Sequence, residues 1–474
     1  MIKKIKYSIL LLFLLVSVNQ IKAQHSQTLY YMNRLPQSMQ MNPAIQPECG
    51  FFLGFPGMSS VQIGVGNNRI ALSDAIQKHP TEDSLITFLH PLANKEDFLS
   101  KIKNLNFLYE DFHTNLFSFG FRAHDWYASF NISERQSATF TYPKDLMTLV
   151  LNGNKEFNNS NIDFTDLDLN MTYFREYGIS LSKNIGSQLT VGGRLKVLFG
   201  KANVSVENHN FKLYSSIDSI HISSDIRVNT SLPVDSKTNA DGDFDGFEDF
   251  DSVDPLDFAL DHSNMGFAVD LGAVYRPIEK VSVSLSIIDL GYIKWSEGVT
   301  NLNLDGQFNF TGIDLSSEFD EDNDDDPFEL LTDSLENSFD ITDKKESYTT
   351  PLGAKIYIGG SYYLTPKVDF SVLSLSRFYE NKIYQAFTFS ANTRPIRGLT
   401  ASFSYSIMNG TYNNLGFGLI LRPGPFQIYI ISDNIASAAM WGHKTSAVNL
   451  RFGMNFAFGN RKKIKDYPML ESSF

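Results

Sequence analysis

Period-two alternation of apolar and polar residues is the feature of this sequence that most constrains its fold. Over residues 188–200, one face collects apolar or small residues at every second position: Leu189, Val191, Gly193, Leu195, Val197 and Phe199. A similar run over 267–275 turns at 276–280 and returns over 281–287. Further alternating runs fill the last third of the chain, at 354–364, 368–377, 384–393, 400–407, 414–421, 426–433 and 448–458. Alternation bounded by short turns predicts antiparallel β-strands.

The opposite face of several predicted strands is polar, with side chains such as Arg194, Lys196, Asp270, Ser282, Ser284 and Ser286. Many of the runs have the roughly 9–11 residues that a tilted strand needs to cross a bilayer. A closed barrel that is apolar outside and polar inside accounts for both faces. We therefore predict an all-β fold, a transmembrane antiparallel β-barrel of about fourteen strands. A soluble sandwich or propeller, whose strands also alternate, is the alternative.

The first residues have the layout of a secretory signal peptide. Lys3, Lys4 and Lys6 precede an apolar stretch over 9–18, and Ala23 offers a small residue for cleavage. The apolar run is too short for a membrane anchor. This layout and the barrel pattern together predict export to the outer membrane of a diderm bacterium. The expected organisation is a signal peptide at 1–23, an N-terminal segment at 24–58, the barrel at 59–458 and a C-terminal tail at 459–474.

Composition and motifs exclude several other classes of protein. The net charge is −13, so there is no general basic footprint for nucleic acid. Cys49 is the only cysteine, which leaves no internal disulfide and no cysteine-rich metal site. The sequence contains no GxxxxGK[ST], GxGxxG, HExxH or GxSxG motif, and the nine histidines are scattered. We therefore expect a protein that is not an enzyme.

The negative charge is concentrated in two segments that break the strand pattern. Residues 241–261 hold nine acids and residues 314–343 hold thirteen, and neither segment contains Lys or Arg. Long segments between barrel strands usually form outward-facing loops. Each segment is therefore predicted to be a long acidic loop, and such loops offer docking surfaces for protein partners.

The first acidic loop also resembles half of a calcium-binding loop. Asp241, Asp243 and Asp245 alternate and are followed by Gly246, which suits carboxylates that wrap around a hard cation. The twelfth position is Ser252 rather than the bidentate Glu of such loops, and Asp249 is a candidate substitute. Two interpretations stay open, a calcium site at these four aspartates and a solvated acidic loop without a ligand.

An Asn42-Pro43-Ala44 triplet lies near the start of the predicted mature chain, after a lead-in rich in Gln, Tyr and Met. In this position the triplet resembles the outer-membrane long-chain fatty-acid transporter superfamily, and the lead-in resembles barrels associated with type IX secretion and gliding. Residues 287–295 and 356–362 are similar to an uncharacterised family of outer-membrane barrels related to both. The resemblance implies a fourteen-stranded barrel with an N-terminal hatch that contains the triplet. The alternative is that the triplet is only a turn before the first strand, because Pro43 fixes its own φ and extends Asn42.

Two functions follow from these expectations. The first is a barrel that binds or passes a hydrophobic or small solute across the outer membrane. The second is a non-catalytic structural or assembly barrel of a secretion or gliding apparatus, with protein partners at its acidic loops. In both cases the barrel contacts outer-membrane lipid. An apolar pocket against the N-terminal segment would favour transport, and a lumen filled with polar side chains would favour the structural role.

Overall fold

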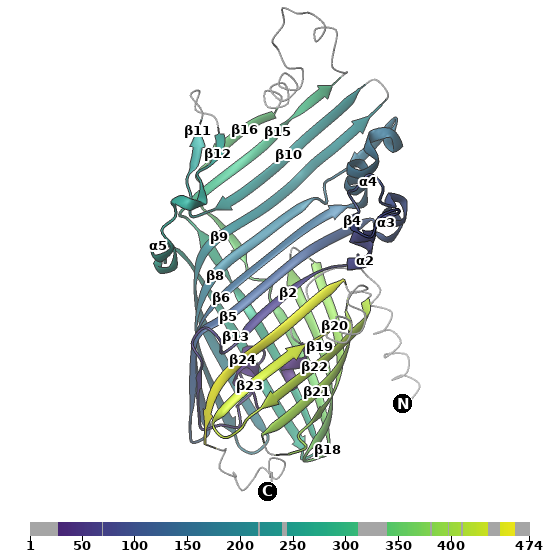
Figure 1. The fold of residues 1–474 in the computed structure, drawn as a ribbon. Helices are drawn as coiled ribbons and strands as arrows, with labels where there is room; N and C mark the ends of the chain where they lie inside the picture. Colours follow the sequence, from purple (N-terminus) through teal and green to yellow (C-terminus); the bar gives the residue numbers. More distant parts are fainter. Residues whose placement is uncertain are drawn as a thin grey trace, which may run out of the picture.

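A computed structural model describes residues 27–68, 70–216, 219–238, 244–310, 339–379, 382–396, 398–408, 411–434 and 446–459. These residues form a closed antiparallel β-barrel of 14 strands (Figure 1). The wall consists of β1 (Phe51–Gly54) with β2 (Val61–Asn67), β5 (Leu105–Ala123), β6 (Trp126–Pro143), β8 (Asp168–Ile185), β9 (Leu189–Ser215), β13 (Asn264–Ile278), β14 (Val281–Trp295), β18 (Lys355–Thr365), β19 (Val368–Tyr379), β20 (Lys382–Thr393), β21 (Leu399–Met408), β22 (Thr411–Leu421), β23 (Phe426–Ser432) and β24 (Ala447–Phe458). The barrel predicted from alternation is thus confirmed, and the predicted signal peptide lies outside the described residues.

The barrel closes at its first strand, which consists of two pieces. Both β1 and β2 pair with β24 on one side and with β5 on the other, in antiparallel register. Residues 55–60 loop out between the two pieces, yet backbone hydrogen bonds such as Phe55 N–H to Met454 O keep the wall continuous. The wall therefore begins at Phe51, within the segment that we expected to precede the barrel.

The two faces of the wall differ as the alternation predicts. Ile179 and Leu195 point outward and are 65% and 67% exposed, whereas the intervening Ser180 and Arg194 are buried inside. The other predicted inward residues, Lys196, Asp270, Ser282, Ser284 and Ser286, are buried as well. Near the short turns, Lys183 lies over the Trp126 ring at 4.8 Å from its centroid. An apolar outer band with aromatic rings at its edge is the lipid-facing surface of an outer-membrane barrel.

At the end opposite the short turns, the sheet extends beyond the closed barrel (Figure 1). The long β9 continues upward and pairs with β10 (Ile220–Ser231), which is followed by β15 (Val299–Phe310) and β16 (Phe339–Lys344). Smaller strands border this region, namely β7 (Ser160–Asp163), β11 (Ser236–Thr238), β12 (Phe244–Phe247) and β17 (Tyr348–Pro351). Most of the second predicted acidic segment, 314–343, lies outside the described residues between β15 and β16.

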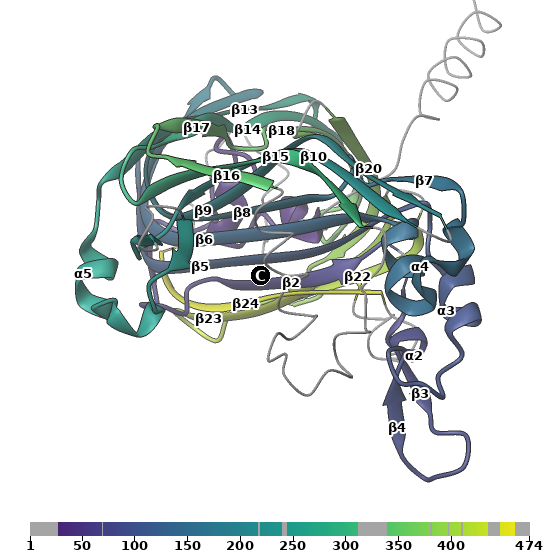
Figure 2. The same cartoon turned by 90° about the horizontal axis from the view of Figure 1, so that it is seen from above.

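Two lobes project sideways from the barrel (Figure 2). One contains α2 (Leu72–Ala75), β3 (Ile76–Lys78), β4 (Leu85–Thr87), α3 (Lys95–Lys101), α4 (Lys144–Asn152) and η3 (Gly153–Phe157). The other contains η4 (Phe250–Ser252) and α5 (Pro255–Leu260). Among the described residues, no helix has the length and apolarity required to cross a bilayer.

Candidate functional site

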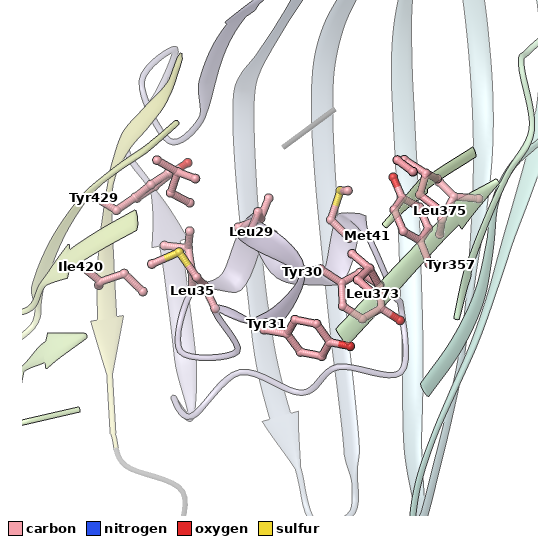
Figure 3. Packing of buried hydrophobic residues seen from close by; sticks show 14 of the residues in the cluster. Leu29, Tyr30, Tyr31, Leu35, Met41, Tyr357, Leu373, Leu375, Ile420 and Tyr429 are labelled. Atoms are coloured by element: carbon pink, nitrogen blue, oxygen red, sulfur yellow. The ribbon is translucent and has the colours of Figure 1, made fainter. Parts of the chain in front are cut away.

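The N-terminal segment, residues 27–50, lies inside the barrel and is not part of its wall (Figures 1 and 3). It contains two short 3₁₀ helices, η1 (Gln27–Tyr31) and η2 (Pro36–Gln40). All five residues of η1 are buried, and η1 packs against β20, β21, β22 and β23 of the wall. Pro36 occupies the first position of η2, where its missing N–H costs no hydrogen bond. Burial of this segment therefore depends on its contacts with the wall.

One side of the segment packs against an apolar part of the wall (Figure 3). Leu29, Met32 and Leu35 are each at most 1% exposed. Together with Tyr30, Tyr31 and Met41, they form one hydrophobic cluster with wall residues Ile288, Tyr357, Leu373, Leu375, Ala386, Met408, Ile420, Tyr429 and Ile431. Inward-facing apolar side chains are unusual in a water-filled barrel, whose interior is polar. We call this set the apolar lumen cluster.

Two tyrosines of the segment add directed contacts to the apolar lumen cluster. The ring of Tyr30 stacks on that of Tyr357 with centroids 5.4 Å apart, and its hydroxyl donates to Ser284 at 3.0 Å. The hydroxyl of Tyr31 donates to the carbonyl oxygen of Val372 at 2.6 Å. Both rings are thus buried against apolar surface, and their hydroxyl groups form hydrogen bonds with the wall.

The beginning of the segment is held by a buried carboxylate. Asp433, which directly follows β23, is fully buried. Its carboxylate accepts hydrogen bonds from the backbone N–H groups of Gln27 and Thr28 at 3.0 and 2.9 Å. The Thr28 hydroxyl also donates to it at 2.5 Å and lies 2.7 Å from the hydroxyl of Ser404. Hydrogen bonds to a charged acceptor are the stronger kind, so this end is firmly attached.

A second attachment joins η2 to the closing strands of the wall. The Gln37 amide donates to Asn455 Oδ1 at 2.9 Å and to the carbonyl oxygen of Ser59 at 3.0 Å. The same carbonyl accepts from the hydroxyl of Tyr429 at 2.9 Å. Ser59 belongs to the loop between β1 and β2, so the segment contacts the wall where its first strand is interrupted.

The Asn-Pro-Ala triplet is buried against the wall on the other side of the lumen. Asn42 Oδ1 accepts from the backbone N–H of Ala44 at 2.9 Å, and its amide donates to Tyr30 at 3.0 Å. Gly272 of β13 faces Gly192 of β9 in register, and a Cβ atom on either would collide with the triplet, at Asn42 and Pro43 respectively. Two paired glycines therefore make room for the three predicted residues.

Next to the triplet, a cluster of buried charges fills the lumen around Asp289 of β14. Asp289 accepts from both terminal nitrogens of Arg135, at 2.9 and 3.0 Å. It also accepts from Lys196 at 2.6 Å and from Lys355 at 2.7 Å. A bidentate guanidinium and two ammonium groups on one carboxylate make a dense ionic contact. Its backbone N–H in turn donates to Asp270 at 2.7 Å.

Two further residues complete this charged lumen cluster. Glu176 pairs with Arg135 at 3.1 Å and with Arg194. Asp270 pairs with Lys196 at 2.7 Å. The cluster thus comprises Arg135, Glu176, Arg194, Lys196, Asp270, Asp289 and Lys355, and every member except Arg135 is under 9% exposed. Removing one partner from such a set would leave an uncompensated buried charge.

Small cavities lie between the segment and the charged lumen cluster. One of about 50 Å³ is lined by Gln40 and Met41 of the segment and by Asp289, Lys355 and Arg451 of the wall. Another of about 20 Å³ lies beside Gln37, Met39 and Arg194. One water requires roughly 10–15 Å³, so the larger cavity accommodates a few waters. In the arrangement described, the segment and its contacts leave little free volume at these two places.

The candidate calcium ligands are only partly described. Asp241, Asp243 and the side chain of Asp245 lie outside the described residues, as does most of the loop at 314–343. Asp249 is exposed and precedes η4, where its carbonyl oxygen accepts from Ser252. Within the part of the chain that the structure describes, no three His, Cys, Asp or Glu residues are grouped to hold a metal. The calcium site stays a prediction.

Sequence reasoning missed the centre of the charged lumen cluster because the strand pattern is broken there. Ile288 and Asp289 are consecutive, yet both are buried. The register between β13 and β14 shifts at this point, and Asp289 has a φ of 62°. A bulge of this kind directs two neighbouring side chains to one face. The charged residue that interrupts an apolar run at 287–290 was the available signal.

A family model with the description "Family of unknown function (DUF5723)" matches residues 43–433. The chain belongs to the DUF5723 family. The match runs from Pro43 of the triplet to Asp433, which anchors the start of the N-terminal segment. It confirms the expected membership of a family of barrels without an assigned function. No curated protein matches this DUF5723 sequence.

Solved structures similar to this DUF5723 protein include two toluene transporters and a FadL homologue. The toluene transporter TbuX of Ralstonia pickettii is 10% identical, with 89% of this chain and 93% of that chain covered and a TM-score of 0.41. A FadL homologue of Pseudomonas aeruginosa is 8% identical, with 93% and 99% covered and a TM-score of 0.39. The toluene transporter TodX of P. putida is 9% identical, with 94% and 96% covered and a TM-score of 0.37. At such low scores, the function has to be argued from the residues of the DUF5723 lumen itself.

Proposed function

We propose that this protein is an outer-membrane channel for hydrophobic small molecules, and that the N-terminal segment closes its lumen as a movable plug. The observation that carries the proposal is the apolar lumen cluster. The segment covers inward-facing apolar residues of the wall, which a barrel built only for water and ions would not need. Export by the signal peptide at 1–23 would bring the barrel to the outer membrane of a diderm bacterium.

The energetics of the apolar lumen cluster indicate which solutes suit the channel. Burial of each fully enclosed Leu or Met side chain contributes roughly 1.5–3 kcal/mol. Moving Leu29, Met32 and Leu35 away from the wall would expose both their own surfaces and the wall residues beneath them. A solute with an apolar body would cover the same wall surface and offset that cost. A fully polar solute would not.

In this proposal, the Asn-Pro-Ala triplet holds the plug against the wall. Asn42 links the triplet to Tyr30 of the apolar lumen cluster, and Gly192 and Gly272 admit Pro43 and Ala44 closely. The test is uptake of a hydrophobic dye into vesicles that contain the full-length protein. Asn42→Ala should change the uptake rate, whereas Asn392→Ala, which alters only wall contacts, should not. Unchanged uptake in a normally folded Asn42→Ala protein would leave the triplet a structural turn.

The second candidate function is a non-catalytic structural or assembly barrel with protein partners at its acidic loops. The charged lumen cluster and the small cavities beside the segment favour it, because a lumen that is only a scaffold can be filled permanently. The same uptake assay separates the two functions. A folded barrel that passes no solute, with or without changes in the segment, would favour the structural role.

A further inference from the structure

The lateral lobe, residues 250–262, is fixed to the outside of the barrel rather than lying over its lumen (Figures 1 and 2). Lys201 donates to the carbonyl oxygens of Phe258 at 2.8 Å and Asp261 at 2.5 Å. Arg175 donates to that of Ala259 at 2.6 Å. Lys201 also lies 5.6 Å from the centroid of the Phe258 ring. These contacts hold the lobe, with α5, against β8 and β9.

The attachment point lies at the upper edge of the lipid-facing band. The ring of His262 packs against that of Phe199 with centroids 4.4 Å apart, and its Nε2 lies 3.1 Å from the hydroxyl of Tyr177. On the outward face of β8, the charged side chains of Arg175 and Lys183 mark the two ends of the stretch that faces the membrane. At roughly 3.3 Å per residue and a tilt near 40°, this stretch spans about 20 Å of membrane thickness. That is close to the height of roughly 25 Å expected for the apolar band.

The lobe exposes three large apolar side chains at this height. Phe250, Leu256 and Leu260 are 60%, 65% and 60% exposed. Leu256 and Leu260 are four positions apart and thus share one face of α5. Asp254 is occupied as the helix cap and accepts from the backbone N–H groups of Leu256 and Asp257. The lobe is therefore amphipathic, and these three apolar side chains are largely exposed in the part of the chain that the structure describes.

A comparable lobe on another side of the barrel indicates what covers these side chains. The lobe with β3 and β4 exposes Leu85, Leu89 and Leu92, and Figure 2 shows it projecting away from the barrel at a distance from α5. A single protein partner would cover the exposed side chains of only one of the two lobes. The bilayer around an outer-membrane barrel would reach both lobes, and it would contact the outward band next to Tyr177 and Phe199.

We propose that the lateral lobe binds the surface of the membrane and inserts Phe250, Leu256 and Leu260 into its interfacial region. Its partner is the lipid of the bilayer that the barrel spans, and the contact continues the apolar band of β8 and β9. Apolar side chains on a short amphipathic helix enter the boundary between headgroups and acyl chains in this way. The lobe then fixes the height of the barrel in the membrane.

Site-specific fluorescence in vesicles tests this proposal. In a Cys49→Ser background, Leu256→Cys and Leu260→Cys are labelled with an environment-sensitive dye, and the full-length protein is reconstituted in phosphatidylcholine vesicles. Ile179→Cys in the apolar band and Asp305→Cys on the exposed extension are the membrane and water controls. Heat-modifiable gel mobility verifies folding of each labelled protein.

The proposal predicts that dyes at 256 and 260 resemble the dye at 179. Their emission should shift to the blue, and nitroxide-labelled lipid should quench them several-fold more than aqueous iodide does. Dyes at 256 and 260 that behave like the dye at 305 would overturn the proposal. So would shielding from both quenchers that appears only at high protein density, because a second copy of the chain would then be the partner.

Discussion

The carboxylate of Asp433 accepts both the backbone N–H and the hydroxyl of Thr28, at 2.9 and 2.5 Å. These two residues are separated by almost the whole barrel in sequence, and their contact ties the start of the N-terminal segment to the end of β23. Asp433→Asn should weaken it, because hydrogen bonds to a charged group contribute about 1.5–3 kcal/mol each. We expect faster proteolysis of the segment in the reconstituted barrel.

A buried carboxylate elsewhere in the wall is the control for Asp433. Asp369 is also buried, and it accepts from Arg394 and Asn392 without contacting the segment. Asp369→Asn should leave the cleavage rate of the segment unchanged. Equal protection of the segment in the Asp433→Asn protein and the wild type would show that this contact does not hold it.

The paired glycines beneath the triplet lead to a second prediction. Gly272→Ala should displace Asn42, since the new Cβ would occupy its position. The triplet cannot move aside easily, because Gly192 on the neighbouring strand is equally close to Pro43. We expect faster proteolysis of the N-terminal segment and a lower unfolding temperature of the barrel. The unfolding temperature is measured from gel mobility after heating. Gly193→Ala, whose Cβ meets no atom closer than 3.8 Å, should behave like the wild type; equal effects of both substitutions would refute this role.

A third prediction concerns the hub of the charged lumen cluster. Asp289→Ala would leave Arg135, Lys196 and Lys355 short of a carboxylate in a buried site. Loss of one partner of a buried ion pair costs about 3–5 kcal/mol. Thermal unfolding in detergent should show this loss of stability. Adding Lys355→Met to the Asp289→Ala protein should recover part of the stability, because it removes one unpaired cation. An Asp289→Ala barrel as stable as the wild type would contradict the account.

Calcium binding by the first acidic loop is a fourth prediction. Titration of the intact protein should give saturable binding that Asp243→Ala weakens, because carboxylate oxygens at alternating positions suit this hard cation. Asp305→Ala, at an exposed site on β15, should bind like the wild type. If no binding is measured at millimolar calcium, the loop is a solvated acidic segment.

The wall could be predicted from sequence because each strand faces two different environments. Lipid on one side and a polar lumen on the other impose the alternation of Leu195 with Arg194 and Lys196, so strand positions follow directly from it. The extension of β9 to Ser215 was not foreseen, since strands above the membrane carry no lipid-facing pattern. The bulge at Asp289 was equally hidden, because it reverses the pattern locally.

The contacts of the N-terminal segment could not be read from the sequence. Its residues are too few to show a period, and their partners, such as Ser284, Ser404 and Asp433, lie hundreds of positions away. The Asn-Pro-Ala triplet was noticed through a resemblance, yet Gly192 and Gly272 acquire meaning only once the barrel brings β9 and β13 beside it.

The central claim is that the N-terminal segment must move for a solute to pass. The side-chain oxygens of Thr28 and Ser404 are 2.7 Å apart and occupy positions that sulfur atoms would take. A disulfide between Thr28→Cys and Ser404→Cys is therefore compatible with an S–S bond of about 2.05 Å after a small shift. In a Cys49→Ser background, this bond would lock the segment to the wall. Asn392→Cys with Ser402→Cys is the matched control, because these residues are register partners on β20 and β21 and share a hydrogen bond of 2.7 Å within the wall.

The decisive measurement is uptake of a hydrophobic dye into vesicles containing each double variant, before and after oxidation. The account predicts that oxidation stops uptake through the Thr28→Cys/Ser404→Cys barrel, that a reductant restores it, and that the control pair is unaffected. Uptake that continues unchanged through the locked barrel would contradict the account.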